Sequence, residues 1–355
     1  MTLDLKAARL DVGDYFEWLE MAYEKRWTDG LPVVPPTPER VQAFIDYVGR
    51  DPLDEVGEIP PKYGIATIEK LAVNAVMGGC RPEYFPVVIA AIEAMLEPPF
   101  NLNGVQTTTH NNEPLAIISG PVVKQIGLNA HTRAFGSGYR ANGTIGRAIR
   151  LVQWNLGGSY PEEPDKSCFS HPGQWCYVLA ENQDANPWEA IHVTRGFPAE
   201  SSCVTVFGCE APHSVFSYGT AVQVLNGIAG AMGTPANNNV QLMGEALVVF
   251  NPFNAATVAG EGWSKRDAQV YLWQHGRVPK RVLEKSSFHP DYAEHHWPKW
   301  LSRDDPDEMI PLTERPEDIH VVVSGGDKKF CMVCPGWGMI GGLAVTKEIK
   351  LPHKK

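Results

Sequence analysis

Three short apolar runs, each followed by turn-forming residues, constrain the fold of this sequence more than any other feature. They read PLAIISGP (114–121), EALVVFNP (245–252) and DIHVVVSGG (318–326). Short apolar runs between turn signals are typical of strands buried on both faces. Because helix-like segments separate these runs, we predict an α/β fold with a mixed or mostly parallel sheet and flanking helices. Their recurrence also suggests an internal repeat.

Capping signals predict where several helices begin and end. A proline at the first helical position after Thr37 predicts a helix over 38–48, and Thr67 and Gly78 bracket another. Ser264 and Asp267 form a capping box for a helix that Gly276 ends. By the same rules, Pro82 is expected to start a helix over 82–96 and Asn142 to cap one that follows a glycine-rich loop.

The chain has 355 residues, of which 43% are hydrophobic and 20% charged. This composition supports a sizeable core and excludes wholesale disorder. We predict a first α/β unit over 1–160, a second over 161–310 after a soft boundary, and a small strand-rich unit over 311–355. The stretch from about 284 to 317 is polar and rich in proline and histidine, and we interpret it as a long connecting segment before that last unit.

The charge balance and the N-terminal residues limit the kinds of partner and the cellular location that we expect. Lys and Arg total 31 against 41 Asp and Glu, a formal net charge of −10. Binding to nucleic acid or to an anionic membrane would need a local basic patch, and the sequence offers none. The N-terminal residues lack a signal-peptide pattern, and seven cysteines in a long chain do not resemble a disulfide framework. We therefore expect a cytoplasmic protein with free thiols and a small-molecule substrate, and leave a homo-oligomer open.

Cys80 is the sharpest single candidate for chemistry. It precedes the helix expected from Pro82, and a thiol at a helix N-terminus is polarised toward thiolate by the dipole and by free N–H groups. Arg81 adds a positive neighbour. The alternative is that Cys80 is a small buried hydrophobe in a tight corner between helices.

A glycine-rich loop with two arginines is the second candidate. Backbone amides and guanidinium groups at a helix start bind phosphate or carboxylate. The spacing matches neither dinucleotide-binding nor phosphate-loop motifs, so a small carboxylate-bearing ligand and a plain tight turn remain the two interpretations. The residues concerned are Gly138, Arg140, Asn142 and Arg147.

Histidines near strand ends form the third candidate, since ligands collect at strand ends in open α/β sheets. His110 precedes a predicted strand, His131 follows it, and Glu210 and His213 follow another. If these ends converge, the side chains offer acid–base groups or ligands for a divalent metal. A pair in C-x-x-C spacing, Cys331 and Cys334, lies on a predicted strand that would turn the two thiols to opposite faces, so we interpret it as structural.

Several long segments resemble the UGSC family of bacterial cysteine or selenocysteine proteins. They are TDGLPVVPPTPERV, IATIEKLAVNAVMGGCRPEYFPVVIAAIEAM, FNLNGVQTTTH, RANGTIGRAIRLV, GWSKRDAQVYLWQHGRVP and PEDIHVVVSGG. The resemblance covers most of the chain and implies relatedness, not a substrate. Family members often carry a selenocysteine-G-S-C module, which would imply thiol or selenol chemistry, and no such segment is present in this sequence. By position the resemblance carries over Cys80, His110, Arg140, Asn142, Arg147, Glu210 and His213.

Together these features predict an enzyme that cleaves a carbon–heteroatom or acyl bond of a small, anionic substrate. Cys80 would be the nucleophile, His110 or His213 would move the proton, and the arginine loop would hold the substrate. One alternative is a metal-dependent hydrolase or lyase, with a site formed by His110, His131, Glu210 and His213. The other is a noncatalytic ligand-binding subunit of a thiol or selenol redox system.

Overall fold

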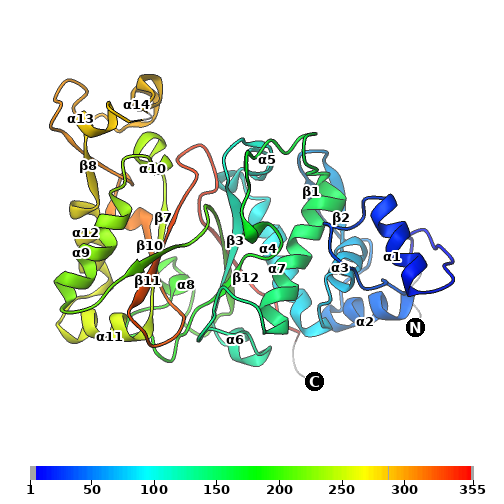
Figure 1. The fold of residues 1–355 in the computed structure, drawn as a ribbon. Coiled ribbons are helices and arrows are strands. Elements are labelled where there is room, and N and C mark those ends of the chain that lie inside the picture. Colours follow the sequence, from blue (N-terminus) through cyan, green and yellow to red (C-terminus); the bar gives the residue numbers. More distant parts are fainter. Residues whose placement is uncertain (1–4, 287, 353–355) are drawn as a thin grey trace.

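Two four-stranded β-sheets lie face to face at the centre of the chain, in a computed structural model that describes residues 5–286 and 288–352 (Figure 1). The first sheet has the order β12-β5-β3-β4, and the second has the order β10-β7-β11-β6. The strands of the first sheet are β3 (Glu113–Ser119), β4 (Val178–Ala180), β5 (Cys203–Cys209) and β12 (Val345–Glu348). Those of the second are β6 (His213–Phe216), β7 (Ala246–Phe250), β10 (Ile319–Val323) and β11 (Phe330–Pro335).

Both sheets are mixed and have the same pattern of directions. In the first, β3 is parallel to β4, while β5 is antiparallel to both β3 and β12. In the second, β7 is parallel to β10, while β11 is antiparallel to both β7 and β6. The α/β fold with mixed sheets is therefore confirmed, whereas the internal repeat stays a prediction.

Helices cover the outer face of each sheet, so the layers run helix, sheet, sheet, helix (Figure 1). Alternate residues of β3 show why its sequence is apolar throughout. Leu115 and Ile117 are buried against the second sheet, whereas Ala116 and Ile118 are buried against helices. A strand covered on both faces needs apolar side chains at every position, as the three apolar runs of the sequence indicate.

The helices packed on the first sheet are α4 (Phe85–Met95) and α7 (Arg140–Val152), with α3 (Ile68–Met77) packed against both of them. Those on the second sheet are α9 (Ala221–Met232) and α12 (Lys265–His275), with α11 (Pro252–Gly260) packed against α9. The shorter or peripheral helices are α1 (Tyr15–Glu24), α2 (Pro38–Val48), α5 (Leu102–Thr107), α6 (Val122–Gln125), α8 (Ile191–Thr194), α10 (Asn238–Leu242), α13 (Lys280–Leu283) and α14 (Pro290–His296). Two antiparallel two-stranded pairs complete the elements named here: the hairpin of β1 (Glu55–Ile59) with β2 (Gly64–Thr67), and β8 (Arg277–Pro279) with β9 (Met309–Pro311).

The capping signals predict three helices correctly and two helix starts wrongly. α2, α3 and α12 begin and end as expected, with the Ser264–Asp267 capping box in place. Pro82 instead opens a 3₁₀ turn, and α4 begins at Phe85, because a helix tolerates Pro86 only in its first turn. α7 begins at Arg140, so Asn142 lies inside the helix and not at its cap.

The chain crosses from one sheet to the other twice. After β3, β4 and β5 have entered the first sheet, β6 joins the second; after β7, β10 and β11 have entered the second, β12 returns to the first. The strands of 311–355 are thus hydrogen-bonded into both sheets. The predicted domain boundaries near 160 and 310 stay predictions.

No single helix among the described residues is long and apolar enough to cross a membrane. One pair of helical segments, 82–95 with 98–107, meets the length and composition together, with a bend of 75° between them.

Candidate functional site

Cys80 lies just before the 3₁₀ turn that precedes α4, and its side chain is buried in the hydrophobic core beside α7. Its side chain is 6% exposed, and its thiol donates a hydrogen bond to the carbonyl oxygen of Thr144 at 3.2 Å. Burial raises the pKa of the Cys80 thiol to about 12, which outweighs that hydrogen bond and the nearby charge of Arg140. The burial and the raised pKa favour the alternative of a small buried hydrophobe, and the reactive thiolate stays a prediction.

The glycine-rich loop uses its polar groups to hold the protein together. The Arg140 guanidinium donates to the carbonyl oxygen of Gly79, and Arg147 pairs with Asp29 at 2.8 Å and also donates to backbone carbonyls of 31 and 32. The buried side chain of Asn142 exchanges two hydrogen bonds with the backbone of Asn129.

These internal contacts favour the plain tight turn over an anion site, the two interpretations that the sequence leaves open. Gly138 is exposed, with a φ of +118°, which suits a glycine turn. Neither Arg140 nor Arg147 lines the polar pocket described below, so the arginines do not act there as an anion grip.

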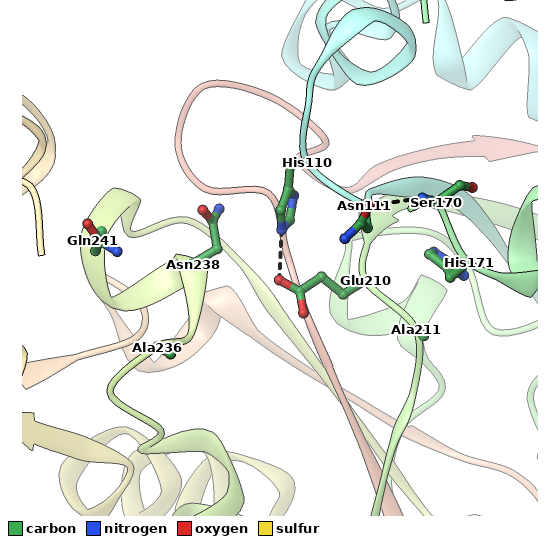
Figure 2. Close-up of a pocket in the computed structure, with 9 residues that line it drawn as sticks. All are labelled: His110, Asn111, Ser170, His171, Glu210, Ala211, Ala236, Asn238 and Gln241. Atoms are coloured by element: carbon green, nitrogen blue, oxygen red, sulfur yellow. Dashed lines mark hydrogen bonds and ion pairs between the residues drawn. The ribbon is translucent and has the colours of Figure 1, made fainter. Parts of the chain in front are cut away.

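His110 and Glu210 are two predicted site residues whose side chains the fold brings into direct contact. The Nε2 atom of His110 lies 2.8 Å from a carboxylate oxygen of Glu210 (Figure 2). The reason is the antiparallel pairing of β3 with β5, which places Glu113 opposite Cys209. The residues just before β3 therefore meet those just after β5, across 100 positions of sequence.

The other two histidines of the predicted set lie elsewhere. His131 follows β3 and α6, and its Nδ1 atom contacts the side-chain amide of Asn182 at 3.2 Å. His213 is exposed at the first position of β6 and does not line the pocket that contains His110. Within residues 5–286 and 288–352, no group of three or more His, Cys, Asp or Glu side chains could hold a metal ion. The predicted metal site is thus not formed.

His110 and Glu210 open onto a polar pocket of about 430 Å³ (Figure 2). One wall comes from the residues just before β3, from those just after β5, and from the loop that carries Ser170 and His171. The other comes from α10 and the residues before it. The lining residues are His110, Asn111, Ser170, His171, Glu210, Ala211, Ala236, Asn238 and Gln241.

Sequence analysis missed the polar residues around the dyad. Asn111 organises the neighbouring loop, since its side-chain oxygen accepts hydrogen bonds from the backbone N–H groups of Phe169 and Ser170 at 2.8 and 2.9 Å. Its amide nitrogen is turned to the side on which His110 and Glu210 lie (Figure 2). The only signal for Asn111 was its position next to His110, and Asn238 stood out only as part of an unspecific run of three asparagines, 237–239. No local motif marked Ser170.

A buried carboxyl group lies directly behind the pocket. The hydroxyl of Ser170 donates to Glu113 at 2.9 Å, and Glu113 is 6% exposed. Burial raises the pKa of Glu113 to about 7, an effect opposed by the charge of Arg150 and by the Ser170 bond and strengthened by Asp165. Glu113 therefore changes its charge near neutral pH.

His171 is a neutral wall of the pocket. Burial lowers its pKa, which outweighs the favourable contacts with the Cys209 carbonyl and the Glu210 carboxylate. Its Nδ1 accepts from the N–H of Gly173, so the proton sits on Nε2, which lies 3.3 Å from the Cys209 carbonyl oxygen.

The two cysteines of the C-x-x-C pair lie on opposite faces of β11, as predicted from the alternation of side chains along a strand. Cys331 is buried with the helices of the second sheet, and Cys334 is buried between the two sheets. The structural interpretation of both thiols therefore agrees with their places in β11.

Comparison with known proteins adds no assignment. No protein-family model, no curated protein and no solved structure matches the chain.

Proposed function

We propose that this protein is an enzyme that cleaves a carbon–heteroatom or acyl bond of a small polar substrate by proton transfer at Glu210 and His110. The observation that carries the proposal is the 2.8 Å contact between these side chains at the mouth of a polar pocket. A carboxylate and an imidazole in hydrogen-bond contact supply a base and a group that stabilises its charge.

Glu210 takes the role of the base in this proposal. Its side chain is 34% exposed, against 21% for His110, so the carboxylate is the more open of the two groups. The Nε2–H of His110 donates to one carboxylate oxygen, which leaves the second oxygen to accept a proton from the substrate or from an attacking water. The hydrogen bond from His110 holds the carboxylate in one orientation while Glu210 takes up this proton and then passes it to the departing group, whose bond to the substrate breaks.

The lining of the pocket favours an uncharged or cationic substrate. Among the described residues that line it, none is a lysine or an arginine, and Glu210 is the acidic one. Amides from both walls, Asn111 and Asn238, offer donors and acceptors for hydroxyl, carbonyl or amide groups of a ligand. This argues against the anionic substrate and the Cys80 nucleophile expected from the sequence.

A noncatalytic ligand-binding subunit is the competing function, because the same pocket could hold a ligand without changing it. A link to thiol or selenol chemistry has less support, because burial raises the pKa of Cys80. Membership of the UGSC family, a cytoplasmic location and a homo-oligomer remain proposals beside this one.

The test is turnover of uncharged chromogenic probes by the wild-type chain and two variants. Suitable probes are p-nitrophenyl acetate for an acyl bond and a β-(p-nitrophenoxy) ketone for elimination. Loss of a general base lowers kcat/KM by about a hundredfold or more, so Glu210→Gln should do so while the exposed Glu261→Gln should not. Equal rates in Glu210→Gln and wild type would refute the role of Glu210. Absence of turnover in wild type would favour the binding subunit.

A further inference from the structure

The backbone that carries Glu210 is held by groups outside the proposed reaction. Glu210 is the first residue after β5, where regular strand pairing has ended. Its N–H donates to the carbonyl oxygen of Pro335 at 2.9 Å, and its own carbonyl oxygen accepts from the hydroxyl of Tyr177 at 2.8 Å. The N–H and the carbonyl group of Glu210 are therefore both held by hydrogen bonds, although the residue lies beyond the strand.

Tyr177 is itself held in one place. It directly precedes β4, its carbonyl oxygen accepts from the N–H of Ala116, and its side chain is 5% exposed between the sheets. The ring of His171 packs edge-on against it, with centroids 5.1 Å apart at 79°. Burial raises the pKa of the Tyr177 phenol well above its ordinary value, so the hydroxyl keeps the proton that it donates.

His171 fixes the preceding peptide in the same way. Its Nε2–H lies 3.3 Å from the carbonyl oxygen of Cys209, the last residue of β5. Two successive carbonyl groups, of Cys209 and Glu210, thus meet donors from the segment 171–177. In the close-up, Glu210 reaches from this side of the pocket toward His110 (Figure 2).

We propose that Tyr177 is a positioning residue, whose hydroxyl, supported by the His171 ring, aims the Glu210 side chain at His110. On a free loop the Cα atom of Glu210 would move relative to His110, and the 2.8 Å contact would be lost for part of the time. With the carbonyl groups of 209 and 210 pinned, the Cα–Cβ bond of Glu210 has one direction, and the dyad is formed before a ligand binds.

The first readout does not depend on turnover. In a histidine-selective ¹⁵N–¹H NMR spectrum, the Nε2-bound proton of His110 reports its hydrogen bond to Glu210. We expect Tyr177→Phe, which keeps the ring but removes the hydroxyl, to shift or broaden this resonance in the direction of Glu210→Gln. The matched control is Tyr271→Phe, which removes a tyrosine hydrogen bond of the same 2.8 Å length, to Asn226, on the far side of the second sheet. It should leave the resonance unchanged.

The kinetic readout rests on the proposed function. With p-nitrophenyl acetate, Tyr177→Phe should lower kcat about fivefold and leave KM unchanged, because it removes one neutral hydrogen bond. If Tyr177→Phe does not fold, His171→Leu removes the other donor and should shift the same resonance, whereas His171→Gln retains a donor and should restore it.

The two proposals fail in different ways. A His110 resonance identical in wild type, Tyr177→Phe and His171→Leu would overturn the positioning role, even where Glu210→Gln abolishes turnover. A shifted resonance without any turnover would support the positioning role and count against the enzyme.

Discussion

Glu113 makes a measurable prediction about stability against pH. Its pKa rises from the ordinary value of 4.5 to about 7 because the carboxyl group is buried. The folded protein therefore holds a proton that the unfolded chain has already released, and the free energy of unfolding falls as pH rises from about 4.5 to about 7. At about 1.4 kcal/mol for each pH unit, this loss amounts to about 3 kcal/mol.

Glutamine at this position removes the loss, because an amide does not ionise and can still accept from Ser170. Urea unfolding from pH 4.5 to 8 should show the stability of Glu113→Gln rising relative to wild type by up to about 3 kcal/mol across that range. Glu181, whose pKa burial also raises to about 7, should give the same result when changed to glutamine. The curve of the exposed Glu261→Gln should parallel wild type. A constant difference between Glu113→Gln and wild type at every pH would refute the reasoning.

Three further predictions concern the burial of Cys80 and the packing of helix α7, which carries Arg147. Iodoacetamide at neutral pH should alkylate the exposed Cys168 and leave Cys80 unmodified, as read by peptide mass spectrometry, and equal labelling would contradict the burial of Cys80. Gly146→Ala should destabilise the fold by about 1–3 kcal/mol in urea, because the new methyl group would lie 2.7 Å from the sulfur of Cys176. Gly143→Ala in the same helix meets nothing within 4 Å and should stabilise the fold by up to about 1 kcal/mol. Arg147→Ala should cost about 3–5 kcal/mol, because it leaves a buried carboxylate unpaired, and a cost below 1 kcal/mol would make the ion pair dispensable.

The fold class was predictable because local signals and burial agreed. The run around Ile117 is apolar at every position since both faces of β3 are covered, and the Ser264 capping box is a local interaction that sequence alone specifies. The start of α4 was mistaken because two prolines four residues apart, Pro82 and Pro86, compete for the first turn of one helix.

The site was predictable only in part because its residues meet through strand direction. His110 and Glu210 were identified as polar residues near strand ends, but a parallel pairing of the two strands would have placed Glu210 beside His131 and left His110 at the opposite edge. The antiparallel pairing of β3 with β5 selects His110 and leaves His131 at the other edge. The second wall, with Asn238, comes from the other half of the chain, and nothing in the local sequence around it indicates this meeting.

The passage of β6 and β12 between the sheets has a consequence during synthesis on the ribosome. The short strand β6, complete by residue 216, gains its hydrogen-bonded neighbour β11 only when residues 330–335 have been translated. One edge of β5 likewise waits for residues 345–348. A nascent chain thus exposes unpaired strand edges until nearly all of the described sequence has emerged, and open edges of this kind promote aggregation. Stalled or prematurely terminated translation products of this protein should accordingly be the species that chaperones retain.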